Sequence, residues 1–152
     1  MKHIATSLLA LALLGAAGHA HAEQNCTIKL AGNDAMQFDQ KSVTVSASCP
    51  KITIQLAHTG KLAANVMGHN VIVSQTADMA AVTAAALKAG AAAGYVPKGD
   101  AKVIAATPTV GGGASTKVSF PGNKLKAGGD YSFYCSFPGH ASMMKGTLVV
   151  TR

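Results

Sequence analysis

Short stretches in which apolar and polar residues alternate recur along the chain. Two of them, residues 43–47 and 52–56, place strand-forming residues at every second position, and this period predicts strands with one buried face. Similar stretches cover residues 71–73, 102–105, 117–120, 131–135 and 146–150. Clusters of Gly, Pro, Asn and Asp separate them and indicate turns. We therefore expect an all-β fold, a Greek-key β-sandwich of seven to eight strands.

One stretch breaks this pattern. Residues 76–93 are rich in alanine, with Asp78 near the start and glycines near the far end. Alanine has the highest helix propensity and glycine commonly follows a helix, so we expect one inserted helix around 76–93. Its apolar residues Met79, Val82 and Leu87 are expected to pack on the sandwich and not to bind a cofactor.

The first two dozen residues have the pattern of an export signal. Lys2 and His3 precede a largely apolar stretch at 4–17, and the small-residue pattern of a cleavage site follows at 20–22. No twin-arginine pair is present, so Sec-type export to the periplasm is expected. We predict a signal peptide at 1–22 and a single domain at 23–152, with no membrane span.

The chain is basic, with 13 Lys and Arg residues against 6 Asp and Glu residues. The basic residues are spread along the sequence and aromatic residues make up only 5% of it, which argues against binding of nucleic acid. Two interpretations of the charge remain open. It either aids solubility or steers the protein toward an acidic partner.

The chain has three cysteines, so one thiol remains after two of them form a disulfide. Cys26 and Cys49 lie at the ends of two early strand-like stretches, whereas Cys135 lies beside a Pro-Gly-His run. We therefore predict a disulfide between Cys26 and Cys49. A lone thiol is a liability in an oxidising compartment, but a thiolate bound to a metal is protected from exchange.

Residues of three metal-binding types lie on one short loop. Cys135 is followed by His140 after four intervening residues and by Met144 after three more, and His69 lies far upstream. Two imidazoles, a thiolate and a weak thioether form the donor set of blue copper sites, which cycle between Cu(I) and Cu(II). The sequence therefore predicts electron transfer as the function.

The motifs around these residues resemble those of the azurins, bacterial members of the cupredoxin family. The resemblance covers essentially the whole of the chain after the signal peptide, and its most specific stretches are residues 32–38, 65–70, 77–79, 135–140 and 144–148. The four residues between Cys135 and His140 are typical of azurins, whereas plastocyanin-like relatives have two. The resemblance implies a cupredoxin-like sandwich.

The resemblance also implies a site for one type 1 copper ion. The ligands carried over to this chain are His69, Cys135, His140 and Met144, with the carbonyl oxygen of Gly68 as a weak axial contact. Asn70 is expected to tie the two ligand loops together, and backbone N–H groups near Asn70 and Phe137 are expected to donate to the sulfur. His58 aligns with an azurin histidine that is not a ligand; a buried structural role is favoured, and a proton-linked role remains open.

In azurins the ring edge of the residue that matches His140 reaches the surface through an apolar patch. The matching positions here are Met36, Leu62, Val66, Met67, Leu87, Phe137, Pro138, Ser142 and Met143. An exposed apolar cluster marks a partner site, and a small interface suits redox proteins that must separate quickly. By family analogy the expected partners are c-type cytochromes or a periplasmic reductase, and the expected oligomeric state is a monomer.

Three other classes compete with an electron carrier. A copper enzyme needs a second centre with further histidines, and after residue 22 only His58 is unassigned. A cysteine hydrolase could use Cys135 with His69 or His140 and Asn70, but that set leaves Met144 unexplained. Zinc also accepts sulfur and imidazole, so a structural zinc site is the third alternative. We expect a non-enzymatic electron carrier.

Overall fold

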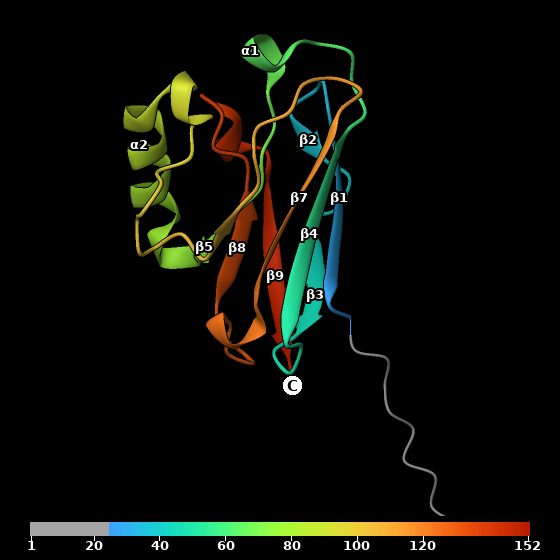
Figure 1. Ribbon diagram of the computed structural model, residues 1–152, viewed down its shortest axis with the longest axis vertical. Coiled ribbons are helices and arrows are strands. Elements are labelled where there is room, and N and C mark those ends of the chain that lie inside the picture. The colour runs from blue at the N-terminus through green and yellow to red at the C-terminus, as the bar shows by residue number, and fades with distance from the viewer. Residues whose placement is uncertain (1–24) are drawn as a thin grey trace, which may run out of the picture.

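Residues 25–152 are described by the computed structural model, so the signal peptide expected at 1–22 lies outside the described residues. This region contains nine strands (Figure 1). They are β1 (Thr27–Asn33), β2 (Gln37–Phe38), β3 (Ser42–Ser46), β4 (Lys51–His58), β5 (Ile72–Gln75), β6 (Ala105–Ala106), β7 (Ser115–Pro121), β8 (Tyr131–Tyr134) and β9 (Lys145–Thr151). The helical elements are α1 (Ala64–Met67), η1 (Thr76–Asp78), α2 (Met79–Ala89), η2 (Ala91–Ala93), η3 (Gly122–Lys124) and η4 (His140–Ser142), where η denotes a 3₁₀ helix.

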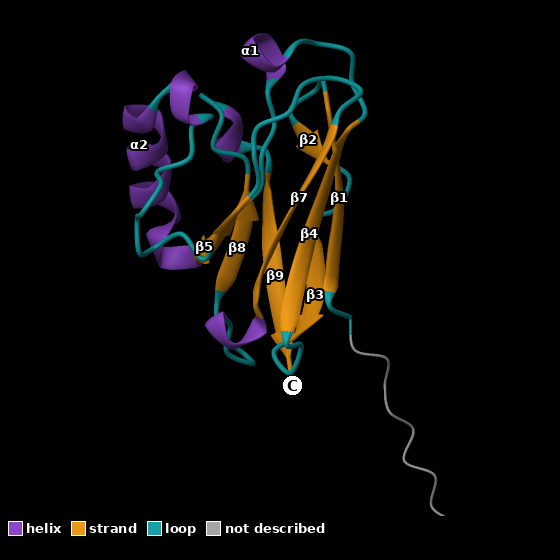
Figure 2. Ribbon diagram, viewed as in Figure 1, coloured by secondary structure: helices purple, strands orange, loops and turns teal. Residues whose placement is uncertain are grey.

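The strands form two facing sheets, as the predicted sandwich requires (Figure 2). One sheet has the order β2-β1-β4-β7 and the other the order β3-β9-β8-β5-β6. The pairs β1–β4 and β3–β9 are parallel, and the remaining pairs are antiparallel. Helix α2 lies outside the sandwich, next to the sheet that contains β5 and β8 (Figure 2).

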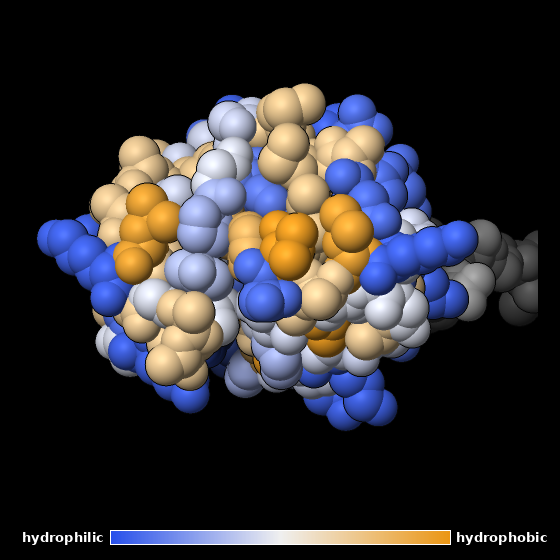
Figure 3. All heavy atoms as spheres, turned by 90° about the horizontal axis from the view of Figure 1, so that it is seen from above, coloured by the Kyte–Doolittle hydropathy of each residue, from blue (hydrophilic) through white to orange (hydrophobic). Residues whose placement is uncertain are grey.

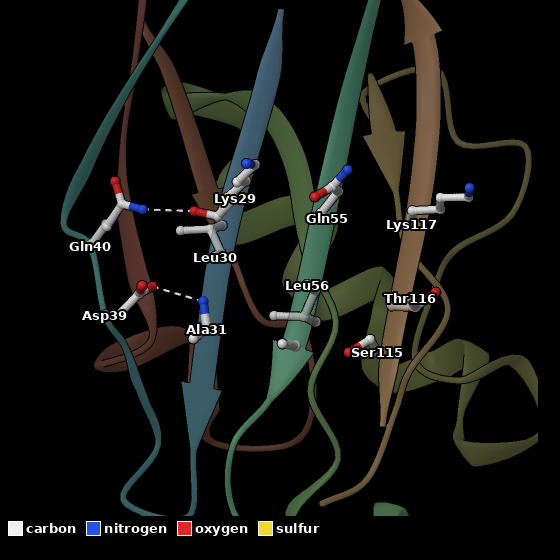
Figure 4. A pocket seen from close by; sticks show the side chains of 11 residues that line it. Lys29, Leu30, Ala31, Asp39, Gln40, Gln55, Leu56, Ser115, Thr116 and Lys117 are labelled. Carbon is white, nitrogen blue, oxygen red and sulfur yellow. Dashed lines mark hydrogen bonds between the residues drawn. The ribbon is translucent and has the colours of Figure 1, made fainter. Parts of the chain in front are cut away.

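The alternation seen in the sequence becomes the inner and outer face of each strand. In β4 the side chains of Ile52, Ile54 and Leu56 are at most 1% exposed, because they point between the sheets. The next positions face outward, and Gln55 lies in register with Lys29 of β1 and Lys117 of β7 (Figure 4). Burying the apolar face removes hydrocarbon from water, which is the main driving force for this fold.

The structure has nine strands, one more than the upper limit of the prediction. Strands β2 and β6 have two residues each, too short for a period of two to reveal. The strand expected at 102–105 is found only at Ala105–Ala106, because the backbone turns at Asp100 and Lys102 instead of pairing. Helix α1, with four residues, was also not predicted.

The inserted helix at 76–93 is present but divided into η1, α2 and η2. Gly90 separates the last two with a φ of +72°, a backbone conformation that residues with a Cβ rarely adopt. Val82 and Ala86 are fully buried against the sheet. The prediction that Leu87 packs on the sandwich was wrong, because its side chain is 50% exposed. None of the helices in residues 25–152 combines the length and the apolar composition needed to span a bilayer.

The strand directions bring the predicted site residues to one end of the sandwich, which we call the ligand end. His69 precedes β5, Cys135 follows β8, and Met144 precedes β9. Since β5 and β9 run antiparallel to β8, the start of the first two and the end of the third meet at the same edge. This end lies at the top of Figure 1.

The predicted disulfide between Cys26 and Cys49 is confirmed. Cys26 lies just before β1 and Cys49 just before β4, and both strands run from there toward the ligand end. The bond therefore closes the opposite end of the sandwich, between residues 23 apart in sequence.

Replacing both cysteines, Cys26→Ser with Cys49→Ser, should lower the free energy of unfolding by about 3 kcal/mol, because the unfolded chain regains the entropy of an open loop. Chemical denaturation of the metal-free protein measures this loss. Wild-type protein unfolded in the presence of dithiothreitol is the control and should show a similar loss. A loss well below 1 kcal/mol would contradict the proposed contribution of the bond. Metal binding at the opposite end should stay at one ion per chain.

Candidate metal centre

Backbone hydrogen bonds fix the two segments that carry the candidate ligands. The N–H and C=O groups of His69 both bond to Val110, at 2.9 Å each. In the other segment the N–H of Cys135 donates to the carbonyl oxygen of Met144 at 2.9 Å, and the N–H of Met144 donates to that of His140 at 2.7 Å. The loop from Cys135 to Met144 is thus closed on itself and has little freedom to rearrange.

Three donor atoms of these segments converge in the interior. The Sγ of Cys135 and one ring nitrogen each of His69 and His140 lie within 4.8 Å of one another. All three side chains are at most 3% exposed. The Sγ of Cys135 lies 3.6 Å from the Nδ1 of His140.

One of the donor atoms has no partner within the described part of the protein. The Nε2 of His69 bonds to the carbonyl oxygen of Asn33 at 2.8 Å, which fixes the ring, while its Nδ1 is buried without a hydrogen bond. A buried polar atom without a partner is costly. A metal ion would satisfy it, and a donor set of sulfur and imidazole suits copper or zinc. These residues therefore fit a metal ion.

Met144 and Gly68 also lie at this point of the structure. Met144 is fully buried, and its methyl group packs beside the ring of His69 against Gly32, where a Cβ would approach both to 2.7 Å. The carbonyl oxygen of Gly68 lies 3.8 Å from the Sγ of Cys135. The structure thus brings the thioether and the carbonyl oxygen to the neighbourhood of the other three donors.

Burial keeps the candidate ligands uncharged in the absence of a metal. It raises the pKa of Cys135 to about 11, although the N–H groups of Asn70 and Phe137 partly offset this by donating to the sulfur. Burial lowers the pKa of His140 to about 4 and also lowers the pKa of His69. Each shift has the direction expected when a charge is removed from water.

The side chain of Asn70 links the two ligand segments. Its Oδ1 accepts a hydrogen bond from the N–H of Ser136 at 2.9 Å, and its Nδ2 donates to the Ser136 hydroxyl at 2.8 Å. The Nδ2 also reaches the Thr109 hydroxyl at 3.3 Å and the carbonyl oxygen of Gly94 at 3.2 Å. All of these contacts lie next to a candidate ligand, since Asn70 follows His69.

Sequence reasoning missed two members of this network. The Thr109 hydroxyl donates to the carbonyl oxygen of Gly94 at 2.6 Å, and the Ser136 hydroxyl donates to that of Tyr95 at 2.5 Å. Through these bonds the segment after α2 is tied to both ligand loops. The position of Ser136 beside Cys135 was a usable signal, but nothing in the sequence places Thr109 at the site.

His58 is buried and stacks on His69 with ring centroids 4.2 Å apart. Its Nε2 bonds to the carbonyl oxygen of Met67 at 2.8 Å, and its Nδ1 accepts from the N–H of Gly60 at 3.1 Å. The carboxylate of Asp34 lies 3.9 Å from the Nε2. Both ring nitrogens are therefore engaged, and the ring supports the back of His69.

His140 lies beneath an apolar surface. Its ring packs on Phe137 with centroids 4.7 Å apart, and both residues are at most 9% exposed. Around them lie exposed apolar side chains that we call the apolar end face: Leu62, Val66, Leu87 and Met143, which are 41 to 57% exposed. Figure 3 views the molecule from this end and shows apolar surface across the middle of the face.

The same geometry argues against the hydrolase alternative. A nucleophilic cysteine must reach its substrate and lose its proton readily. The side chain of Cys135 is fully buried and the pKa of its thiol is raised to about 11. The thiol is thus placed to bind a metal and not to attack a substrate.

Comparison with known proteins agrees with this donor set. Residues 24–151 match the family of copper binding proteins described as the plastocyanin/azurin family. The chain belongs to this family. Azurin from Bordetella pertussis is 52% identical over 123 residues, which cover 81% of this chain and 82% of that protein. Azurin-1 from Alcaligenes xylosoxydans xylosoxydans is 51% identical over 123 residues, with 81% and 95% covered.

A solved structure is also similar. It is an azurin, Az-iso2, from the obligate methylotroph Methylomonas sp. strain J, with a TM-score of 0.79 and 38% identity, covering 84% of this chain and 98% of that chain. Members of this family are electron carriers and not enzymes. The chain is accordingly a blue copper electron-transfer protein, and its cofactor is copper. The predictions of family, fold, function and cofactor are confirmed.

The pKa shifts predict how metal affinity depends on pH. Between pH 6 and 8 the Cys135 thiol, with a pKa of about 11, is protonated, whereas His140, with a pKa of about 4, is already neutral. Metal binding must therefore release one proton, and the affinity of the metal-free protein for Cu(I) should rise about tenfold per pH unit in this range. Competition with a chelator of known pH dependence measures it. Cys135→Ser should abolish most of the slope, and a pH-independent affinity of the wild type would contradict the prediction.

Proposed function

We propose that this protein carries single electrons between redox proteins of the periplasm through one copper ion held by four side chains. The proposed ligands are His69, Cys135, His140 and Met144, with the carbonyl oxygen of Gly68 as a weak contact. The observation that carries this assignment is the convergence of three buried donor atoms within 4.8 Å, one of which has no hydrogen-bond partner among residues 25–152.

When bound, copper supplies a couple that gains or loses one electron without bond breaking. The task of the chain is to keep the ligands where they are while the charge changes. The hydrogen bond from His69 to Asn33 and the bonds that close the loop between Cys135 and Met144 oppose any movement. A site that rearranges little loses little energy to reorganisation, which favours rapid transfer.

We propose His140 as the point where electrons enter and leave. Its ring lies under Phe137 and beside the apolar end face, so a partner that covers this face comes close to a ligand. Apolar contact without many hydrogen bonds suits a complex that forms and dissociates quickly. Proposed partners are c-type cytochromes or a periplasmic reductase, and the protein is proposed to act as a monomer.

The periplasmic location rests on the first residues of the sequence. The pattern at 1–22 supports a cleaved signal peptide, and the domain proposed at 23–152 would remain. The disulfide between Cys26 and Cys49 is consistent with an oxidising compartment.

An optical spectrum of the copper-loaded protein tests the proposed function. We expect an intense blue band from thiolate-to-Cu(II) charge transfer that bleaches when one electron per copper is added. Cys135→Ser should lose the band while keeping the far-ultraviolet circular dichroism of the fold, because the side chain is similar in size. A colourless copper-loaded wild type, or zinc found as the native metal, would overturn the assignment.

Met144→Leu tests the proposed role of Met144 as a weak ligand. The variant should stay blue and its reduction potential should rise, because a weak donor that favours Cu(II) is lost. If that donor favours Cu(II) about tenfold, the rise is about 59 mV for a one-electron couple. Met143→Leu is the matched control, since the same change is made at a neighbouring side chain that is 51% exposed, and its potential should be unchanged. A fall in potential for Met144→Leu, or equal shifts in both variants, would contradict this role.

A further inference from the structure

Lysine side chains surround the apolar end face. The Nζ of Lys41 donates to the carbonyl oxygen of Met143 at 3.1 Å, which places its charge beside that side chain. Lys61 directly precedes Leu62 in the loop before α1. These two lysines come from different loops. Lys41 lies beside Met143, and Lys61 lies beside Leu62.

Two more lysines lie near Leu87. Lys145 and Leu87 line the same groove, together with Ala141 and Ser142 of the loop that carries His140. Lys88 follows Leu87 in the last turn of α2. We call Lys41, Lys61, Lys88 and Lys145 the lysine rim. In Figure 3 hydrophilic side chains project at both sides of the apolar surface.

The carboxylates of the described residues offset this rim only in part. Asp34 lies at the ligand end, and it accepts hydrogen bonds from the N–H groups of Lys61 and Leu62, which lower its pKa. Asp78 and Asp130 lie beyond the paired ends of β5 and β8 that point away from the ligand end.

Each of the remaining two carboxylates accepts a hydrogen bond from a backbone N–H. The carboxylate of Asp39 bonds to the N–H of Ala31 on the outer face of β1 (Figure 4). Asp100 bonds to the N–H of Lys102 in the turn before β6. The four lysines of the rim therefore outnumber the two carboxylates nearest to them, Asp34 and Asp39, which leaves excess positive charge around the surface that covers His140.

We propose that the lysine rim selects a redox protein whose docking face has an apolar centre surrounded by carboxylates. This inference rests on the proposed function and specifies its partner. Charges at the edge of an interface act mainly on the rate of encounter, by attracting a partner of opposite charge before contact. The apolar centre then supplies short-range contact over His140, and exposed charge pairs add little affinity, so the complex still dissociates quickly.

The same arrangement disfavours two other occupants. A second copy of the protein would bring two positive rims together, which opposes association. Electron self-exchange between reduced and oxidised copies should therefore be slow at low ionic strength and several-fold faster at high ionic strength. An anionic membrane surface carries the complementary charge but has no acceptor for the electron. The experiment below distinguishes binding to a membrane from binding to a redox protein.

The experiment uses copper-loaded protein and two small oxidants of opposite charge, ferricyanide and tris(phenanthroline)cobalt(III). The rim variant carries Lys61→Glu and Lys88→Glu. The control variant carries Lys51→Glu and Lys124→Glu, which lie where β4 begins and β7 has ended, at the opposite end of the sandwich. Both variants have the same formal charge, so they differ only in where the charge was changed.

At low ionic strength the rim variant should react with ferricyanide about tenfold more slowly than wild type and with the cobalt complex correspondingly faster. The control variant should change both rate constants by less than about threefold. Salt at about 0.5 M should remove most of the difference, because it screens charges beyond a few ångströms. A c-type cytochrome with carboxylates around its haem edge should follow ferricyanide, and one with lysines there should follow the cobalt complex.

Equal changes in both variants would show that only total charge matters, and unchanged rates would show that the rim does not steer; either result overturns the proposal. Vesicles of phosphatidylglycerol give a further test. If wild type binds them, the rim variant does not, and the oxidant rates are the same for both proteins, the surface is assigned to a membrane. That result would also overturn the proposal. The blue band is recorded first for each protein. Its absence in wild type would refute the proposed function, whereas a blue protein with unchanged rates refutes only the role of the rim.

Discussion

The hydrogen bonds of one buried amide hold the candidate metal centre together. The two ligand segments are far apart in sequence, and the side chain of Asn70 joins them by bonding to both the N–H and the hydroxyl of Ser136. Because Asn70 follows His69 and Ser136 follows Cys135, any shift between the segments breaks these bonds. A buried amide left without partners costs more free energy than the bonds contribute. The relative position of the donors is therefore fixed by the fold before a metal arrives.

A pre-formed site of this kind is tolerable only because its donors carry no charge without the metal. Burying an ionised thiolate would cost several kcal/mol, and the shift in the pKa of Cys135 to about 11 avoids that cost. The lowered pKa of His140 acts in the same way for an imidazolium. The remaining penalty is the burial of the His69 Nδ1, which has no hydrogen-bond partner in the part of the chain that the structure describes. The protein thus stores a small unfavourable term that metal binding removes, and the affinity for the ion gains by that amount.

Much of the fold could be predicted because strands with one buried face repeat at period two, as β4 does with Ile52, Ile54 and Leu56. The candidate site could be predicted because its residues are chemically distinctive and three of them share one loop. The short strands β2 and β6 could not, since two residues carry no period. Thr109 could not either, because its hydrogen bonds depend on how the segment after α2 folds back. Helical spacing misplaced Leu87, because an apolar residue at that spacing looks the same whether it faces the core or a partner, whereas the family resemblance places it in the surface patch.

Separation of the two ends of the sandwich explains how a stiff site can sit beside an accessible surface. The disulfide closes the end opposite the ligands, and the core between the sheets is continuous from there to Met144. The loop between β8 and β9 contributes Cys135, Phe137 and Met144 to this core, while Met143 on the same loop is exposed at the surface. His140 links the stiff site to the accessible surface, because its Nδ1 faces the buried sulfur while its ring packs under Phe137 near the surface. On the proposed route through His140, an electron crosses only one side chain between the interior and a partner, and no movement of the backbone is required.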